Sequence, residues 1–128
     1  MFLGLRTVIY PAPDLAAAKA WYSRILGVEP YFDEEYYVGF NLAGYELALD
    51  PGGDAATGVV TYWGVADVDA AVDALVARGA TLRDPVREVG GSIRVALVAD
   101  PAGNPIGVIE NPRFQLPSST VPADGPGR

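Results

Sequence analysis

Histidine and cysteine are both missing from this 128-residue chain. Without histidine, the chain lacks the commonest general base, the usual member of a catalytic triad and the commonest ligand for first-row metals. Without cysteine, it forms no disulfide, no thiolate nucleophile and no cysteine-ligated metal site. Any chemistry here therefore has to come from carboxylates, hydroxyls and aromatic rings.

Basic residues are also scarce, with 9 lysines and arginines against 16 acidic residues and a formal charge of −7. Since no basic stripe is evident, we expect neither nucleic acid nor a membrane surface as a partner, and a small molecule or another protein instead. The apolar start MFLGLRTVIY is too short, and has the wrong flanks, for a signal peptide or a membrane span. We therefore expect a cytoplasmic protein.

The residues that are present predict strands and helices in a repeated order. In the first half, a β-favouring run predicts a strand over 3–10, and apolar residues at helical spacing predict a helix from the Asp14 N-cap to Gly27. An acidic and aromatic loop is expected over 31–35. It is followed by a predicted hairpin, with strands over 36–42 and 45–50 joined by a turn at Ala43-Gly44. After the turn-forming segment 51–54 they predict a strand over 59–65, a helix from Asp67 to Gly79, a short strand at 81–83, a turn at Pro85, and strands over 92–98 and up to Glu110.

This repetition predicts an α+β fold of two tandem βαβββ modules, because a repeat too small to bury its own sheet face must cover it with its twin. We expect one domain over residues 1–112, with module one at 1–51 and module two at 58–111. The segment 113–128, rich in proline, serine and glycine, is expected to be an extended or disordered tail. Within it, Phe114 and Leu116 are candidates to fold back onto the domain or to reach a second subunit.

At this point the sequence resembles the vicinal oxygen chelate superfamily, which holds glyoxalase I, extradiol dioxygenases and the bleomycin-resistance proteins. The resemblance is carried by PDLAAAKAWYSRILGV in the first half, and by VADVDAAVDALVARGA and DPAGNPIGVIE in the second. It implies curved mixed sheets around an open groove, with a homodimer commonly completing the site.

The resemblance also implies where a metal would be held, on the first and last strand of each module. The positions that match the family's ligands are Thr7 and Val60 for the histidines and Ala48 and Gly107 for the carboxylates. None of these four side chains is a good metal ligand, and carboxylates without imidazole make a weak site. We therefore expect no metal and no other cofactor.

Alternation of side chains along the strands predicts a mainly apolar groove with a few polar groups, which is typical of a ligand pocket. Tyr31, Phe32 and Tyr36 are expected to roof this groove. The predicted ligand-binding residues are Thr7, Ile9, Phe32, Tyr36, Tyr37, Asn41, Glu46, Ala48, Val60, Tyr62, Arg94, Ala96, Gly107 and Ile109. The alternative role of Tyr36 and Tyr37 is packing, and the alternative for Glu46 and Arg94 is an exposed cross-strand pair.

Two functions follow from the groove. The first is metal-independent binding of a hydrophobic or aromatic antibiotic or metabolite, which a protein resembling the bleomycin-resistance proteins would sequester. The second is a metal-free isomerase, cyclase or hydrolase of natural-product metabolism, with Glu46 as base and Tyr62 or Tyr37 as proton donor. A purely structural partner protein is a third alternative, which predicts a large apolar outer patch.

Overall fold

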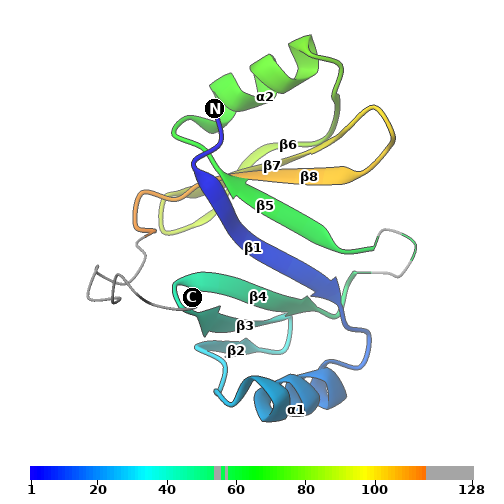
Figure 1. Cartoon of the computed structure of the whole chain (residues 1–128), viewed down its shortest axis with the longest axis vertical. Helices are drawn as coiled ribbons and strands as arrows, with labels where there is room; N and C mark the ends of the chain where they lie inside the picture. The colour runs from blue at the N-terminus through cyan, green and yellow to red at the C-terminus, as the bar shows by residue number, and fades with distance from the viewer. Residues whose placement is uncertain (54–55, 57, 115–128) are drawn as a thin grey trace, which may run out of the picture.

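A computed structural model describes residues 1–53, 56 and 58–114 of the chain. Two helices lie against one mixed sheet of eight strands (Figure 1). The elements in chain order are β1 (Gly4–Pro11), α1 (Leu15–Leu26), β2 (Phe32–Glu34), β3 (Tyr37–Leu42), β4 (Tyr45–Asp50), β5 (Val60–Gly64), α2 (Val68–Ala77), β6 (Thr81–Gly90), β7 (Ile93–Ala99) and β8 (Pro105–Glu110).

Both helices begin at the predicted aspartates. The side chain of Asp14 accepts a hydrogen bond from the Ala17 amide, and that of Asp67 accepts one from the Ala70 amide, so each satisfies an amide that has no partner within its helix. Gly27 ends α1 in the left-handed conformation, with φ of 72°. Among the helices of the described ranges, none is long and apolar enough to cross a membrane.

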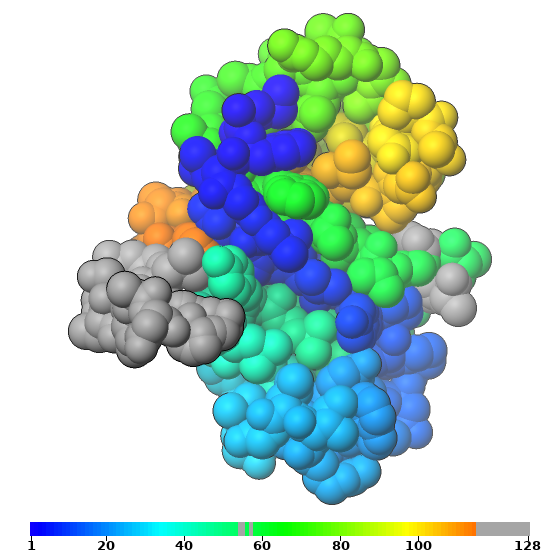
Figure 2. All heavy atoms as spheres, viewed as in Figure 1, coloured from blue at the N-terminus to red at the C-terminus, as the bar shows by residue number. Residues whose placement is uncertain are grey.

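The sheet is built from two similar halves. The strand order is β2-β3-β4-β1 in the first half and β6-β7-β8-β5 in the second, with β1 parallel to β4 and β5 parallel to β8. The halves join through the antiparallel pair β1 and β5, which cross the molecule between the two helices (Figures 1 and 2). This arrangement confirms the predicted α+β fold of two βαβββ modules.

Each module buries its own apolar cluster between its helix and one face of the sheet. In module one the cluster contains Ala12, Val38, Phe40 and Leu49, and in module two it contains Val65, Val68, Ala71, Val72, Ala96 and Val108. The strand registers place both clusters on the same face of the sheet. The opposite face carries no helix within the described part of the chain, so this second face is the open groove.

Two predictions about the outer strands were wrong. The expected loop at 31–35 contains the edge strand β2, which pairs with β3. The expected turn at Pro85 does not form, because β6 runs from Thr81 to Gly90 with bulges in its pairing to β7. Proline lacks an amide proton, and an edge strand with a bulge is where a sheet tolerates it.

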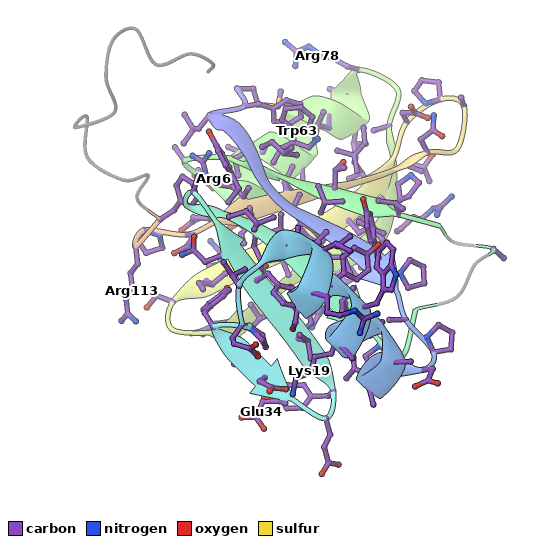
Figure 3. The ribbon with its side chains drawn as sticks, turned by 60° about the horizontal axis from the view of Figure 1, so that its bottom comes forward. Arg6, Lys19, Glu34, Trp63, Arg78 and Arg113 are labelled. Carbon is purple, nitrogen blue, oxygen red and sulfur yellow. The ribbon has the colours of Figure 1, made fainter. Side chains whose placement is uncertain are left out.

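The chain after β8 does fold back, as predicted for Phe114. Its ring lies 3.8 Å beneath the guanidinium carbon of Arg6 and 6.4 Å from the ring of Tyr45, measured between centroids. Arg6 belongs to a bulge in β1, and Figure 3 shows it in the same half of the molecule as Trp63 of β5. Leu116 and the rest of the predicted tail lie outside the described residues.

Candidate functional site

One row of side chains crosses the open face from module one to module two. Thr7 of β1 stands opposite both Glu46 of β4 and Tyr62 of β5, and Tyr62 stands opposite Gly107 of β8. These four residues come from the first and last strands of the two modules. The next row contains Ile9, Ala48 and Val60.

Glu46 is the centre of a hydrogen-bonded cluster in this row. Its Oε1 accepts hydrogen bonds from the hydroxyls of Thr7 at 3.0 Å and Tyr37 at 2.9 Å. Its Oε2 accepts a third from the hydroxyl of Tyr31 at 2.7 Å. Thr7 is only 7% exposed, whereas Tyr31 is 61% exposed and stands at the rim. The four residues are called the Glu46 cluster below.

Gly39 makes room for this cluster on the neighbouring strand β3. A Cβ at position 39 would lie 2.5 Å from Glu46 Oε2 and 3.2 Å from Cε1 of Tyr31. Any larger residue would therefore push the carboxylate away from the Tyr31 hydroxyl. The absence of a side chain at position 39 is thus a condition for the geometry of the Glu46 cluster.

The two tyrosine hydroxyls of the cluster are held in their protonated form. Burial raises the pKa of Tyr37, and the charge of Glu46 and the hydrogen bond to it raise this pKa further. Burial and the hydrogen bond to Glu46 raise the pKa of Tyr31 in the same way. Both hydroxyls therefore act as donors to Glu46 at neutral pH.

Tyr62 forms the floor of the groove in module two. Its ring lies over the backbone of Gly107, where a Cβ would come within 2.4 Å of Cδ2 of Tyr62. Burial raises the pKa of its hydroxyl, which also experiences the charges of Arg87, Asp84 and Asp50. No hydrogen bond of this hydroxyl is found within the part of the chain that the structure describes, so it is available to a ligand.

Asp84 and Arg87 belong to the groove and were missed by the sequence interpretation. They stand opposite Leu97 and Val95 on β7, which face the groove, and their charges act on the Tyr62 hydroxyl. A turn at Pro85 would have left them outside the sheet. The residues around Pro85, LRDPVREV, carry their charges in adjacent pairs, so no alternation of period two marked one long edge strand.

Arg94 and Ala96 were predicted in the groove, and this placement was wrong. Arg94 forms ion pairs with Asp69 of α2 and with Glu110 of β8, and Ala96 packs in the core cluster beneath α2. Both therefore lie on the face that carries the helices. The groove side of β7 is formed by Val95 and Leu97, which pair with Ile109 and Gly107.

The remaining predicted residues divide between the groove and its rim. On the open face lie Thr7, Ile9, Phe32, Tyr37, Glu46, Ala48, Val60, Tyr62, Gly107 and Ile109. Tyr36 is exposed and packs edge-on against Phe32 at the rim, with 6.1 Å between ring centroids. Asn41 uses its Oδ1 to accept a hydrogen bond from the Gly44 amide, so it stabilises the hairpin turn.

A small pocket continues the groove beyond the row of Ile9 and Val60. It has a volume of about 210 Å³ and is lined also by Pro11, Asp50 and three glycines. A wider hollow of about 540 Å³ lies beside α1, between Ala16 and Glu29, and includes no predicted site residue. The groove is the better candidate because the polar cluster and the aromatic rings converge there.

The residues of the groove do not fit a divalent metal. The row across the four inner strands offers one carboxylate, and its oxygens already accept three hydroxyl hydrogen bonds. Within the described residues, no three Asp, Glu, His or Cys side chains come together. Hydroxyls and one carboxylate make a poor ligand set compared with imidazoles and several carboxylates.

The fold and the groove define a paired βαβββ protein with an open, partly aromatic sheet face. The family model described as Glyoxalase/Bleomycin resistance protein/Dioxygenase superfamily matches residues 4–108, and the chain belongs to this superfamily. No curated protein matches the chain.

Solved structures share the fold at low sequence identity. A methylmalonyl-CoA epimerase variant from Streptomyces coelicolor, in complex with 2-nitronate-propionyl-CoA, has a TM-score of 0.70 and 19% identity over 91% of this chain and 100% of its own. A superfamily member from Vibrio splendidus has a TM-score of 0.62 and 19% identity over 83% and 97%. A Mn(II)-bound glyoxalase from Novosphingobium aromaticivorans has a TM-score of 0.68 and 20% identity over 86% of this chain and 39% of its own.

Proposed function

We propose that this protein binds a small molecule with a hydrophobic or aromatic body in its open groove and holds it unchanged. The bound molecule would be an antibiotic or a metabolite, sequestered as the resemblance to bleomycin-resistance proteins implies. No metal takes part in this proposal. A homodimer, also expected from the resemblance, stays a prediction beside it.

The observation that carries the proposal is that the Glu46 carboxylate already accepts three hydrogen bonds from hydroxyl groups. A carboxylate offers about four lone-pair sites, and three hydroxyls already occupy three of them. A substrate proton would find only one free lone-pair site on this carboxylate. The Glu46 cluster is therefore better suited to fixing the shape and charge of the groove than to taking up a proton.

The walls of the groove support the same function. Ile9, Val60 and Leu97 line it with partly exposed aliphatic surface, Ala48 and Val95 are buried on the same face, and Tyr62 adds an aromatic floor. Aromatic rings stack on flat guests, and the Tyr62 hydroxyl, which has no hydrogen-bond partner among the described residues, provides a directional contact. A pocket with apolar walls and few polar groups binds ligands of this kind.

The first test is a thermal-shift screen of the purified protein against planar hydrophobic natural products, because a ligand of the native state raises the melting temperature. Mass spectrometry of the recovered ligand then shows whether it is unchanged. Stabilisation with unchanged recovery supports binding. A complete lack of stabilisation by the panel contradicts the proposal.

Replacing Tyr62 by phenylalanine is expected to weaken such a ligand about fivefold, because one hydrogen bond contributes about 1 kcal/mol. The ring over Gly107 is retained in this variant, so the groove keeps its floor. Isothermal titration calorimetry measures the change. Tyr45→Phe is the matched control, since Tyr45 lies at the hairpin end outside the groove. Equal losses in both variants would place the hydroxyl contact elsewhere.

A metal-free enzyme is the second candidate, and one observation favours it. The Tyr37 hydroxyl lies 2.9 Å from Glu46 inside the groove, within reach for proton transfer between an acid and a base. For an enzyme, Glu46→Gln is expected to abolish turnover of a bound compound while its binding persists. Product formation measured by liquid chromatography decides this, and turnover that survives the substitution excludes Glu46 as the base.

A further inference from the structure

The Glu46 cluster carries a negative charge without a cationic partner. Three ion pairs are found in the described part of the chain, and none of them involves Glu46. Glu46, Tyr31 and Tyr62 raise the pKa of Tyr37, and no lysine or arginine is among the groups that shift this pKa. A half-buried carboxylate in this setting is stabilised only by its hydroxyl donors.

The cluster presents acceptors, and no donors, to a molecule in the groove. Tyr31 and Tyr37 both direct their protons to Glu46, so their oxygens keep only lone pairs for a further partner. Glu46 itself keeps one unused lone-pair site. A guest that approaches this cluster therefore has to bring its own hydrogen-bond donors.

Aromatic rings surround the same place. Phe32 meets Tyr37 edge-on with 5.9 Å between ring centroids, and it meets Tyr36 edge-on on its other side. The planes of these pairs are tilted by 74° and 75°, so the rings meet edge to face and are not stacked on each other. The negative face of an aromatic ring attracts a cation.

The arginines on this face act at other places than the Glu46 cluster. Arg6 lies over Gly64 and the Phe114 ring, and Arg87 acts on Tyr62 together with Asp84 and Asp50. Glu34 belongs to the edge strand β2, where it adds negative charge at the rim (Figure 3). Glu46 and Glu34 therefore make this end of the groove anionic, whereas the module-two side combines aliphatic side chains with the Tyr62 ring and the opposite charges of Asp84 and Arg87.

From these observations we propose that the Glu46 cluster binds a cationic nitrogen, a protonated amine or an amidinium, while the hydrophobic body of the same ligand lies along the groove toward Tyr62. The cation satisfies the unpaired carboxylate and donates to the tyrosine oxygens. This assignment rests on the proposed binding function and adds the class and the orientation of the ligand.

Three probes with one aromatic body test the inference: naphthylmethylamine, naphthylmethanol and naphthoate. Isothermal titration calorimetry at neutral pH is expected to show the amine binding roughly tenfold more tightly than the alcohol, and the carboxylate most weakly, because only the cation adds the attraction of opposite charges to its hydrogen bond with Glu46. The preference for the amine is expected to fall as salt is added.

Two variants and one control complete the test. Glu46→Gln is expected to lower the affinity for the amine to that for the alcohol. Glu29→Gln removes the same charge beside α1 and is expected to leave the preference for the amine intact. Tyr31→Phe removes one of the tyrosine oxygens that accept from the cation and keeps the charge of Glu46, so the preference for the amine is expected to fall in part but not to vanish. This second variant keeps the inference testable if Glu46→Gln fails to fold.

The outcomes separate the inference from the proposed function. Equal binding of amine and alcohol, or an amine preference unaffected by Glu46→Gln, overturns the cationic site and leaves groove binding standing. Failure of all three probes to bind contradicts both. Tightest binding by the carboxylate also overturns the inference and points to Arg87 as the polar contact.

Discussion

Replacing Phe40 with alanine is expected to lower the free energy of unfolding by about 3–5 kcal/mol, the usual cost of removing a buried phenyl ring. Phe40 has no exposed surface and lies among Val38, Leu49 and Ala12 beneath α1. The helix has no fully buried residue of its own, so it depends on this cluster to hold it against the sheet. Since a domain is stable by only about 5–15 kcal/mol, the loss is a large part of the total.

Urea denaturation followed by circular dichroism measures this effect. Phe32→Ala is the matched control, because Phe32 lies on the edge strand β2 and is 37% exposed. It is expected to lose clearly less stability than Phe40→Ala, while it lowers ligand binding. Equal losses in the two variants would mean that α1 is not held by the Phe40 cluster.

Replacing Gly107 with alanine is expected to cost about 1–3 kcal/mol in stability, as overpacking usually does. The new Cβ would come within 2.4–2.7 Å of three atoms of the Tyr62 ring. Two of these atoms, Cγ and Cδ2, are close to the root of the side chain, and the strands β5 and β8 are hydrogen-bonded neighbours. The ring has to leave its place, so ligand binding falls together with stability.

Gly64→Ala provides the control for Gly107→Ala on the adjoining strand. A Cβ at Gly64 would come within 2.7–2.9 Å of the Arg6 guanidinium, the far end of a flexible side chain that can move away. Gly64→Ala is therefore expected to change the free energy of unfolding by no more than about 1 kcal/mol in either direction. In the double variant Gly107→Ala/Tyr62→Ala, the clash is absent. A cost of Gly107→Ala that is unchanged without the Tyr62 ring would contradict the steric explanation.

The local elements could be predicted because their signals are local. Asp14 and Asp67 satisfy helix amides a few residues ahead of them, and Gly27 supplies the left-handed residue that ends α1. The turn at Ala43 and Gly44 has φ of 55° and 94°, as a tight hairpin requires. These features depend only on neighbours in the chain.

The face of β7 could not be predicted, because both of its faces are apolar. In Ile93–Ala99 the only charged residue is Arg94, which was assigned to the groove, yet its partners Asp69 and Glu110 lie beside α2. A strand that is apolar on both sides has no alternation of polar and apolar residues to show which side chains face the helices and which face the groove. The pairing of β7 with β8 decides instead which of its side chains face the groove.

The sequence alone determined that no imidazole or thiolate is available, that two βαβββ modules form, and that Glu46 and Tyr62 face an open groove. Only the tertiary structure decided which groups act on them. Tyr31 reaches Glu46 across the space left by Gly39, and the pairing of β6 with β7 on both sides of Pro85 places Asp84 and Arg87 where their charges act on Tyr62. These contacts join residues far apart in the chain, and their geometry depends on strand register and on bulges. A sequence pattern of period two leaves both of these unspecified.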